Sequence, residues 1–148
     1  MEKRAVLFVD DDEILLKSIE KCIADEPYDK YFTTSGEDAL EILKREEVHI
    51  IVVDIIMPGM GGIELLKIVK KDYPNIVSMV ISGYAQSADA MKALSDLGVY
   101  KFIAKSWTFD ENIRMVIRQT LDHYNLQSEH EDMAAELERC SNRTISAE

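Results

Sequence analysis

The sequence predicts an α/β fold, a doubly wound five-stranded parallel sheet with helices on both faces. Five short apolar stretches alternate along the chain with five segments whose apolar residues have helical spacing. The apolar stretches at residues 5–9 and 50–53 are continuous, which is typical of parallel strands covered on both faces. Right-handed crossovers then place helices on the two sides of the sheet.

The predicted elements follow one another in regular order. The expected strands are residues 5–9, a weaker 31–32, 50–53, 76–81 and 100–104. The intervening helices are indicated by apolar residues three and four positions apart, which are Leu15, Ile19 and Ile23; Ala39, Leu40 and Leu43; Ile63, Leu66 and Val69; Ala90, Leu94 and Leu97; and Ile113, Ile117, Leu121 and Tyr124. Typical helix-end residues support these boundaries: Ser35, Gly98, and Thr108 with Glu111.

Length and composition indicate one folded domain followed by an extension. The chain has 148 residues, of which 47% are hydrophobic and 30% charged, as in ordinary globular proteins. We expect residues 1–125 to form the domain and acid-rich residues 126–148 to form an extended C-terminal helix or a linker to a missing output domain. Either the domain stands alone, or a longer chain continues past Glu148.

The charge balance disfavours several classes of partner. Lys and Arg number 17 against 28 Asp and Glu, so the formal charge is −11 and direct nucleic-acid binding is not expected. No apolar run has the length of a membrane span and the first residues do not form a signal peptide, so we expect a cytoplasmic protein without membrane attachment. Cys22 and Cys140 have no metal-site spacing and are interpreted as plain thiols.

Reactive side chains end or follow four of the five predicted strands. Asp10 and Asp11 follow the first strand, Asp54 the third, Ser82 the fourth and Lys105 the fifth. In open parallel sheets, functional groups collect beyond the carboxyl ends of the strands. We therefore expect these side chains to share one edge of the sheet.

The chemistry of this set indicates phosphoryl transfer. Clustered carboxylates at Asp10, Asp11 and Asp54 repel one another unless a cation neutralises them, and Mg²⁺ is the usual ion for oxygen ligands. With the ion bound, Asp54 stays ionised and acts as a carboxylate nucleophile toward a phosphoryl group. Ser82 and Lys105 then supply a hydroxyl and an ammonium to the phosphoryl oxygens.

Four stretches carry a specific family pattern: VLFVDDD at residues 6–12, VDIIMPGMGG at 53–62, ISGYA at 81–85 and KFIAK at 101–105. From Lys3 to about Tyr124 the sequence resembles the receiver domain of two-component response regulators. The resemblance implies a flavodoxin-like strand order, 2-1-3-4-5. It also implies that Asp54 accepts a phosphoryl group from a phosphohistidine on a sensor histidine kinase or phosphotransfer protein. The implied Mg²⁺ ligands are Asp10, Asp11, Asp54 and the backbone carbonyl of Ile56.

The same resemblance implies a switch and a means of setting its lifetime. Ser82 and Phe102 fall on the coupled switch positions, which alter the face made by the predicted fourth helix, fifth strand and fifth helix. Ile56 and Tyr84 fall on the positions that flank the path of hydrolytic water. A receiver catalyses its own phosphorylation and dephosphorylation but is not a turnover enzyme on external substrates.

Two positions depart from the family pattern. Ser106 follows Lys105 where Pro is common; a cis peptide costs about 3–4 kcal/mol before Ser against about 0.5–1 kcal/mol before Pro, so a trans bond is expected. Gly61 stands where Asp or Asn commonly precedes the glycine Gly62, so the loop is expected to be loose and entropically costly to order. Neither change removes a reacting group.

Other interpretations remain open at this point. A haloacid-dehalogenase-type phosphatase also uses an Asp-x-Asp pattern, present at residues 10–12, but it needs a later acidic pair on a strand end and gives Asp54 no role. A degenerate receiver that serves only for docking is a second alternative. The alternative for the acids at residues 10–12 is a helix cap with solvated charges. The alternative for Phe102 is a core residue without a switch role.

The tail suggests a homodimer through the C-terminal helix. Its residues alternate by three and four positions, the spacing of a coiled coil, at Val116, Gln119, His123, Leu126, His130, Met133, Leu137 and Cys140. Gln119 and the two histidines interrupt this seam, so a solvated, charged helix is the alternative.

Overall fold

The computed structural model describes residues 4–55, 60–82, 92, 94–104 and 112–125. Its elements in chain order are β1 (Ala5–Val9), α1 (Glu13–Cys22), β2 (Asp29–Thr33), α2 (Gly36–Arg45), β3 (Ile50–Asp54), α3 (Gly62–Asp72), β4 (Val77–Ser82) and β5 (Lys101–Ala104). Residues 92, 94–96 and 112–125 are also helical. The chain divides into two compact units, Met1–Met115 and Val116–Glu148. The predicted extension at residues 126–148 lies outside the described residues.

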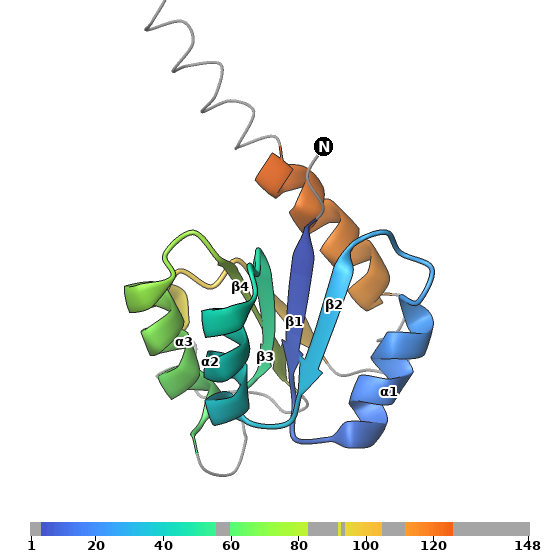
Figure 1. The fold of residues 1–148 in the computed structure, drawn as a ribbon. Coiled ribbons are helices and arrows are strands. Elements are labelled where there is room, and N and C mark those ends of the chain that lie inside the picture. Colours follow the sequence, from blue (N-terminus) through green and yellow to red (C-terminus); the bar gives the residue numbers. More distant parts are fainter. Residues whose placement is uncertain (1–3, 56–59, 83–91, 93, 105–111, 126–148) are drawn as a thin grey trace, which may run out of the picture. The chain divides into compact units, whose positions relative to one another are not determined.

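The strands form one parallel sheet in the order β2-β1-β3-β4-β5, which confirms the predicted fold class and strand order. Figure 1 shows α1 on one face of this sheet and α2 and α3 on the other. The inner strands β1 and β3 are buried at every position, as their continuous apolar sequences require. The predicted strand 31–32 is longer in the structure, whereas Ile76 and Tyr100 lie just outside β4 and β5.

The hydrophobic core fills the space on both sides of the sheet. The cluster that includes α2 and α3 contains Leu7 and Ile51 from the sheet together with Leu43, Leu65 and Leu66 from the helices, all 6% exposed or less. Stacked aromatic rings join β1 to β2, with the ring centroids of Phe8 and Phe32 5.1 Å apart. This packing holds the strand ends in a fixed order, and those ends carry the candidate site.

Side chains cap the starts of α1 and α2, and a glycine follows the helical residues 94–96. The Asp12 carboxylate accepts hydrogen bonds from the backbone amides of Ile14 and Leu15, and caps α1. Ser35 caps α2 in the same way, by accepting a hydrogen bond from the Asp38 amide at 3.1 Å. Gly98 has a φ of 73°, which a glycine adopts without strain. The predicted Thr108 and Glu111 cap lies outside the described residues.

His49 has a structural role at the opposite end of the sheet from the strand carboxyl ends. Its Nδ1 accepts a hydrogen bond from the Ala5 amide at 3.0 Å, and its side chain is buried. Its backbone amide donates to the Ala5 carbonyl, and its carbonyl accepts from the Val77 amide. The residue therefore joins the starts of β1, β3 and β4.

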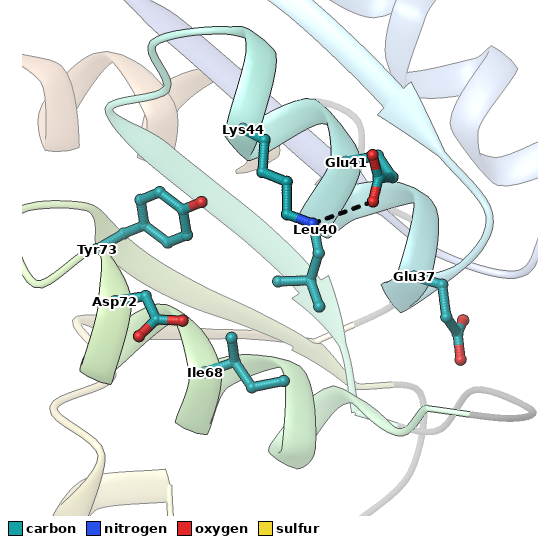
Figure 2. Close-up of a pocket in the computed structure, with 7 residues that line it drawn as sticks. All are labelled: Glu37, Leu40, Glu41, Lys44, Ile68, Asp72 and Tyr73. Atoms are coloured by element: carbon teal, nitrogen blue, oxygen red, sulfur yellow. Dashed lines mark hydrogen bonds and ion pairs between the residues drawn. The ribbon is translucent and has the colours of Figure 1, made fainter.

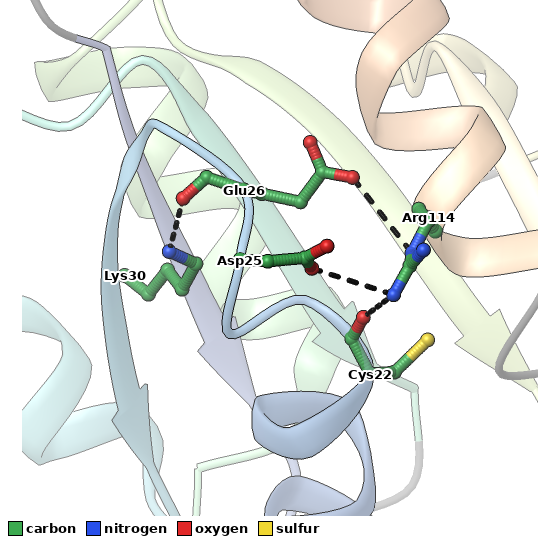
Figure 3. A network of polar contacts seen from close by, with 5 residues as sticks. All are labelled: Cys22, Asp25, Glu26, Lys30 and Arg114. Atoms are coloured by element: carbon green, nitrogen blue, oxygen red, sulfur yellow. Dashed lines mark hydrogen bonds and ion pairs between the residues drawn. The ribbon is translucent and has the colours of Figure 1, made fainter.

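A polar network fixes the loop between α1 and β2 (Figure 3). Arg114 donates to the backbone carbonyl of Cys22 and to the carboxylate of Asp25, and its Nε lies 3.7 Å from the carboxylate of the buried Glu26. Lys30 donates from its Nζ to the Glu26 carbonyl at 2.7 Å. One guanidinium therefore connects the helical residues 112–115 to the loop that leads into β2.

Within the parts of the chain that the structure describes, no helix combines the length and the apolar character needed to cross a bilayer.

Candidate metal centre

Three carboxylates meet at the carboxyl edge of the sheet. Asp10 follows β1 and Asp54 ends β3, and these strands are direct neighbours, with Val9 opposite Val53. One carboxylate oxygen from each of Asp10, Asp11 and Asp54 lies within 4.8 Å of the others. The structure therefore brings together the three acids that the sequence places at the strand ends.

The three acids differ in exposure and in hydrogen bonding. Asp10 is fully buried, Asp54 is 6% exposed and Asp11 is exposed. The backbone amide of Asp10 donates to the Thr33 carbonyl at 3.2 Å, and its Oδ1 accepts from the Asp12 amide at 2.9 Å. The helix-cap interpretation of this acidic run is thus correct for Asp12, whose side chain caps α1, whereas Asp10 turns inward to the site.

Gly62 allows α3 to begin directly against the backbone of Asp54. A Cβ at this position would lie 2.3 Å from the Asp54 carbonyl oxygen and 2.8 Å from the Cα of Ile55. The Gly62 amide also donates to the Ile55 carbonyl at 3.1 Å. Sequence reasoning described these glycines only as loose and missed this contact; the available signal was a glycine that immediately precedes an apolar helical pattern and follows a strand-end acid.

The donor set suits a small, hard divalent cation. Carboxylates held within 4.8 Å of one another repel strongly, and burial of two of them reduces the screening by water. An ion with oxygen ligands removes this repulsion, and Mg²⁺ keeps several waters when bound to proteins. The exposed Asp11 leaves one side of the cluster open to solvent, as a partly hydrated ion requires.

The other predicted site residues are placed only in part. Ser82 is the last residue of β4, beside Ala104 of β5, and Ile81 pairs with Asp54, so the Ser82 backbone adjoins the acidic cluster. The side chain of Ser82, and the whole of Lys105, Ile56 and Tyr84, lie outside what the structure describes. Phe102 on the edge strand β5 is 37% exposed, so the alternative of a buried core residue is wrong.

Known proteins are similar to this chain in sequence and architecture. A family model described as the response regulator receiver domain matches residues 6–117. The hydrogenase transcriptional regulatory protein HoxA of Cupriavidus necator is 35% identical over 136 residues, which are 92% of this chain and 28% of HoxA. The heme response regulator HssR of Staphylococcus aureus is 37% identical over 125 residues, 84% of this chain and 54% of HssR. The chain thus spans between about a quarter and about half of these relatives.

Solved structures agree with the sequence match. A CheY-like response regulator receiver domain protein from Methanospirillum hungatei superposes with a TM-score of 0.78 at 25% identity, over 85% of this chain and 99% of the other. The haloacid-dehalogenase alternative is therefore wrong, because residues 6–117 match the model of a different family. The chain belongs to the response regulator receiver domain family, and it is a signalling module of a two-component system rather than a turnover enzyme.

Proposed function

We propose that this domain is a Mg²⁺-dependent phosphoacceptor that receives a phosphoryl group on Asp54. Receiver domains take phosphoryl groups from histidine kinases. The observation that carries the proposal is the acidic cluster, in which Asp54 ends a buried strand and lies within 4.8 Å of two further carboxylates. The donor is the phosphohistidine of a sensor histidine kinase or of a phosphotransfer protein.

The site residues have separate roles in the phosphoryl transfer. Asp10, Asp11, Asp54 and the Ile56 carbonyl would hold Mg²⁺, which would supply positive charge for the approach of an anionic phosphoryl group. An Asp54 carboxylate oxygen forms a bond to phosphorus as the phosphorus–nitrogen bond of the phosphohistidine breaks, and that electron pair stays on the histidine ring. Ser82 and Lys105 bind the phosphoryl oxygens and hold them in line.

Phosphorylation then changes the surface around β5. The phosphoryl group carries about 1.5–2 negative charges beside Ser82, and the Ser82 hydroxyl moves to hydrogen-bond one of its oxygens. Phe102 turns inward into the space that this movement leaves, which alters the exposed face that includes β5. The 37% exposure of Phe102 supports this role, because a ring at the surface has an outward position from which to turn.

The relatives of the domain and its net charge support an inference about its output and its partners. HoxA is a transcriptional regulatory protein and HssR a heme response regulator, and both are longer than this chain. We infer that phosphorylation here also controls an output function, in the cytoplasm, and that this chain does not itself bind nucleic acid, given its net charge of −11.

Labelling with a small phosphodonor tests the assignment. The chain is incubated with Mg²⁺ and acetyl phosphate, and the modified residue is located by mass spectrometry. We expect label on Asp54 only, none in Asp54→Asn, and normal label in Asp12→Asn, a control that removes a nearby carboxylate but keeps a good helix cap. Label on Asp10, or on another carboxylate in Asp54→Asn, contradicts the site assignment. An unlabelled wild-type chain supports a docking module.

The metal role has its own test. Because Mg²⁺ binds the folded state, it should raise the melting temperature by an amount that grows with the logarithm of its concentration above the dissociation constant. Asp11→Ala removes one ligand and should need a higher Mg²⁺ concentration for the same rise in melting temperature. The same rise at the same Mg²⁺ concentration in Asp11→Ala and wild type contradicts a metal role for this residue.

A further inference from the structure

A groove lies between α2 and α3, and its described lining includes no residue of the acidic site. It encloses about 400 Å³, which lies within the range of about 300–1,000 Å³ that is usual for small-ligand pockets. Figure 2 shows Leu40 of α2 and Ile68 of α3 facing the groove from its two sides. Both side chains are half-buried and form an apolar surface for the body of a ligand.

Charge on the rim of this α2–α3 groove is mostly negative. The rim carries the exposed carboxylates of Glu37, Glu41 and Asp72. Among the described residues Lys44 is the only cation lining it, and its Nζ lies 3.3 Å from the Glu41 carboxylate, with both side chains 65% exposed. An exposed pair of this kind is weak and easily exchanged for another partner. The groove therefore favours a positively charged ligand.

These carboxylates give no indication of a metal ion as that ligand. Within the described parts of the chain, the group of three acids with ligand atoms within 4.8 Å of one another is Asp10, Asp11 and Asp54, and the rim acids of the groove do not form such a group. A fitting ligand must instead contact an apolar wall and reach separate carboxylates at the same time.

Tyr73 adds a preference for a planar cation. It lies at one end of the groove, with its hydroxyl directed toward α2 (Figure 2). The face of an aromatic ring attracts cations, and guanidinium stacks on it better than an ammonium does. An arginine side chain has the required parts, which are an aliphatic stem and a planar head that donates to two carboxylates.

We propose that the α2–α3 groove docks an arginine side chain from a basic segment of a partner protein. The stem covers Leu40 and Ile68, and the guanidinium lies beside Tyr73 and replaces Lys44 at Glu41. A basic segment suits this acidic rim better than the surface of a second copy of this chain, in which 28 acids outnumber 17 bases. An uncharged apolar segment does not suit it either, because it would remove water from the rim carboxylates without pairing them. The proposal does not depend on phosphorylation of Asp54.

Peptide titration followed by NMR tests the proposal on the full chain. The probe is a blocked Gly-Arg-Gly peptide, and its control contains citrulline, which has the same shape without the charge. Saturating Mg²⁺ occupies the acidic cluster, so that the peptide does not bind there. We expect the arginine peptide to shift the backbone amide signals of α2 and α3, and the citrulline peptide to leave them unchanged.

Matched substitutions separate the groove from general charge attraction. Asp72→Asn should weaken binding by about 1.5- to 5-fold, the size expected for one exposed ion pair, and Lys44→Ala should strengthen it. Glu64→Gln, on the same helix but outside the groove, is the control and should have no effect. Equal weakening by Asp72→Asn and Glu64→Gln overturns the proposal. Equal binding of the citrulline peptide, shifts confined to the acidic cluster, or no shift at all also overturns it.

Discussion

Replacing Gly62 by alanine should damage both the stability of the domain and the position of Asp54, its proposed phosphoacceptor. The added Cβ would lie 2.3 Å from the Asp54 carbonyl oxygen, whereas ordinary contacts begin at 3.4 Å, so α3 and the end of β3 must separate by about 1 Å. Both contacting groups are backbone and cannot turn away. Overpacking of this kind typically costs about 1–3 kcal/mol. A displacement of about 1 Å at a reacting group can cost about 100-fold in rate.

The neighbouring glycine provides a matched control with the opposite sign. Gly61 is the N-cap of α3, with a φ of −73°, and it makes no side-chain cap hydrogen bond. A Cβ added to Gly61 would have no described atom within 4 Å. Gly61→Ser should therefore stabilise the domain by about 0.5–1 kcal/mol, by supplying a cap and by restricting the unfolded chain.

Thermal melting and acetyl phosphate labelling measure the two effects. We expect Gly62→Ala to lower the melting temperature by about 3–10 °C and to slow labelling of Asp54, and Gly61→Ser to raise the melting temperature slightly with normal labelling. If Gly62→Ala melts and reacts like the wild type, the close approach of α3 to Asp54 does not limit this site. Destabilisation of similar size in both variants also refutes the reasoning.

Three further predictions concern other parts of the chain. Small polar residues at both Ile56 and Tyr84 should speed dephosphorylation by about tenfold, or about 1.4 kcal/mol in barrier, because hydrolytic water gains access; equal decay rates of the phosphorylated proteins would show that shielding is absent. Burial and the hydrogen bond to Glu46 raise the pKa of Tyr31 above its ordinary 10.0, so the stability that neutral Tyr31 contributes should be lost as the pH rises above 10. Spectrophotometric titration should show a lower Tyr31 pKa in Glu46→Gln than in the wild type. The same Tyr31 pKa in both proteins would contradict this cause. Light scattering should detect a dimer of the full chain that Leu137→Glu disrupts, whereas a monomer in both, with and without phosphorylation, leaves the tail as a free extension.

The strands that could be predicted best are those with a continuous apolar sequence. The prediction for β1 matches its observed bounds, and β3 differs only by the inclusion of Asp54. The edge strand β2 was underestimated as residues 31–32, because a strand that pairs on one side tolerates Asp29 and Lys30, which apolar runs do not reveal. Strand pairing, rather than residue type, determines the true ends of β2.

The acidic cluster was predictable for a different reason. Parallel strands bring their carboxyl ends to one edge, so the positions of Asp10 and Asp54 in the sequence already imply their proximity. The chemistry of three consecutive acids does not by itself divide the roles within residues 10–12. The family resemblance assigned Asp10 and Asp11 to the ion, and the structure groups these two with Asp54 while Asp12 caps α1. The close approach at Gly62 was missed because it depends on how α3 packs, which no local pattern encodes.

The central position of β1 has a consequence for biosynthesis. β1 leaves the ribosome before the other strands of this sheet, yet one of its two neighbours is β3, with Val6 opposite Ile50. Until that later segment emerges, one edge of a fully apolar strand has no partner and is open to pairing with other chains. The entropy cost of closing the loop between β1 and β3 grows only slowly with loop length. The separation of these strands in sequence therefore affects the rate of folding much more than the stability of the folded domain. A nascent chain of this kind is therefore most vulnerable to aggregation before β3, the strand that ends in Asp54, has been made.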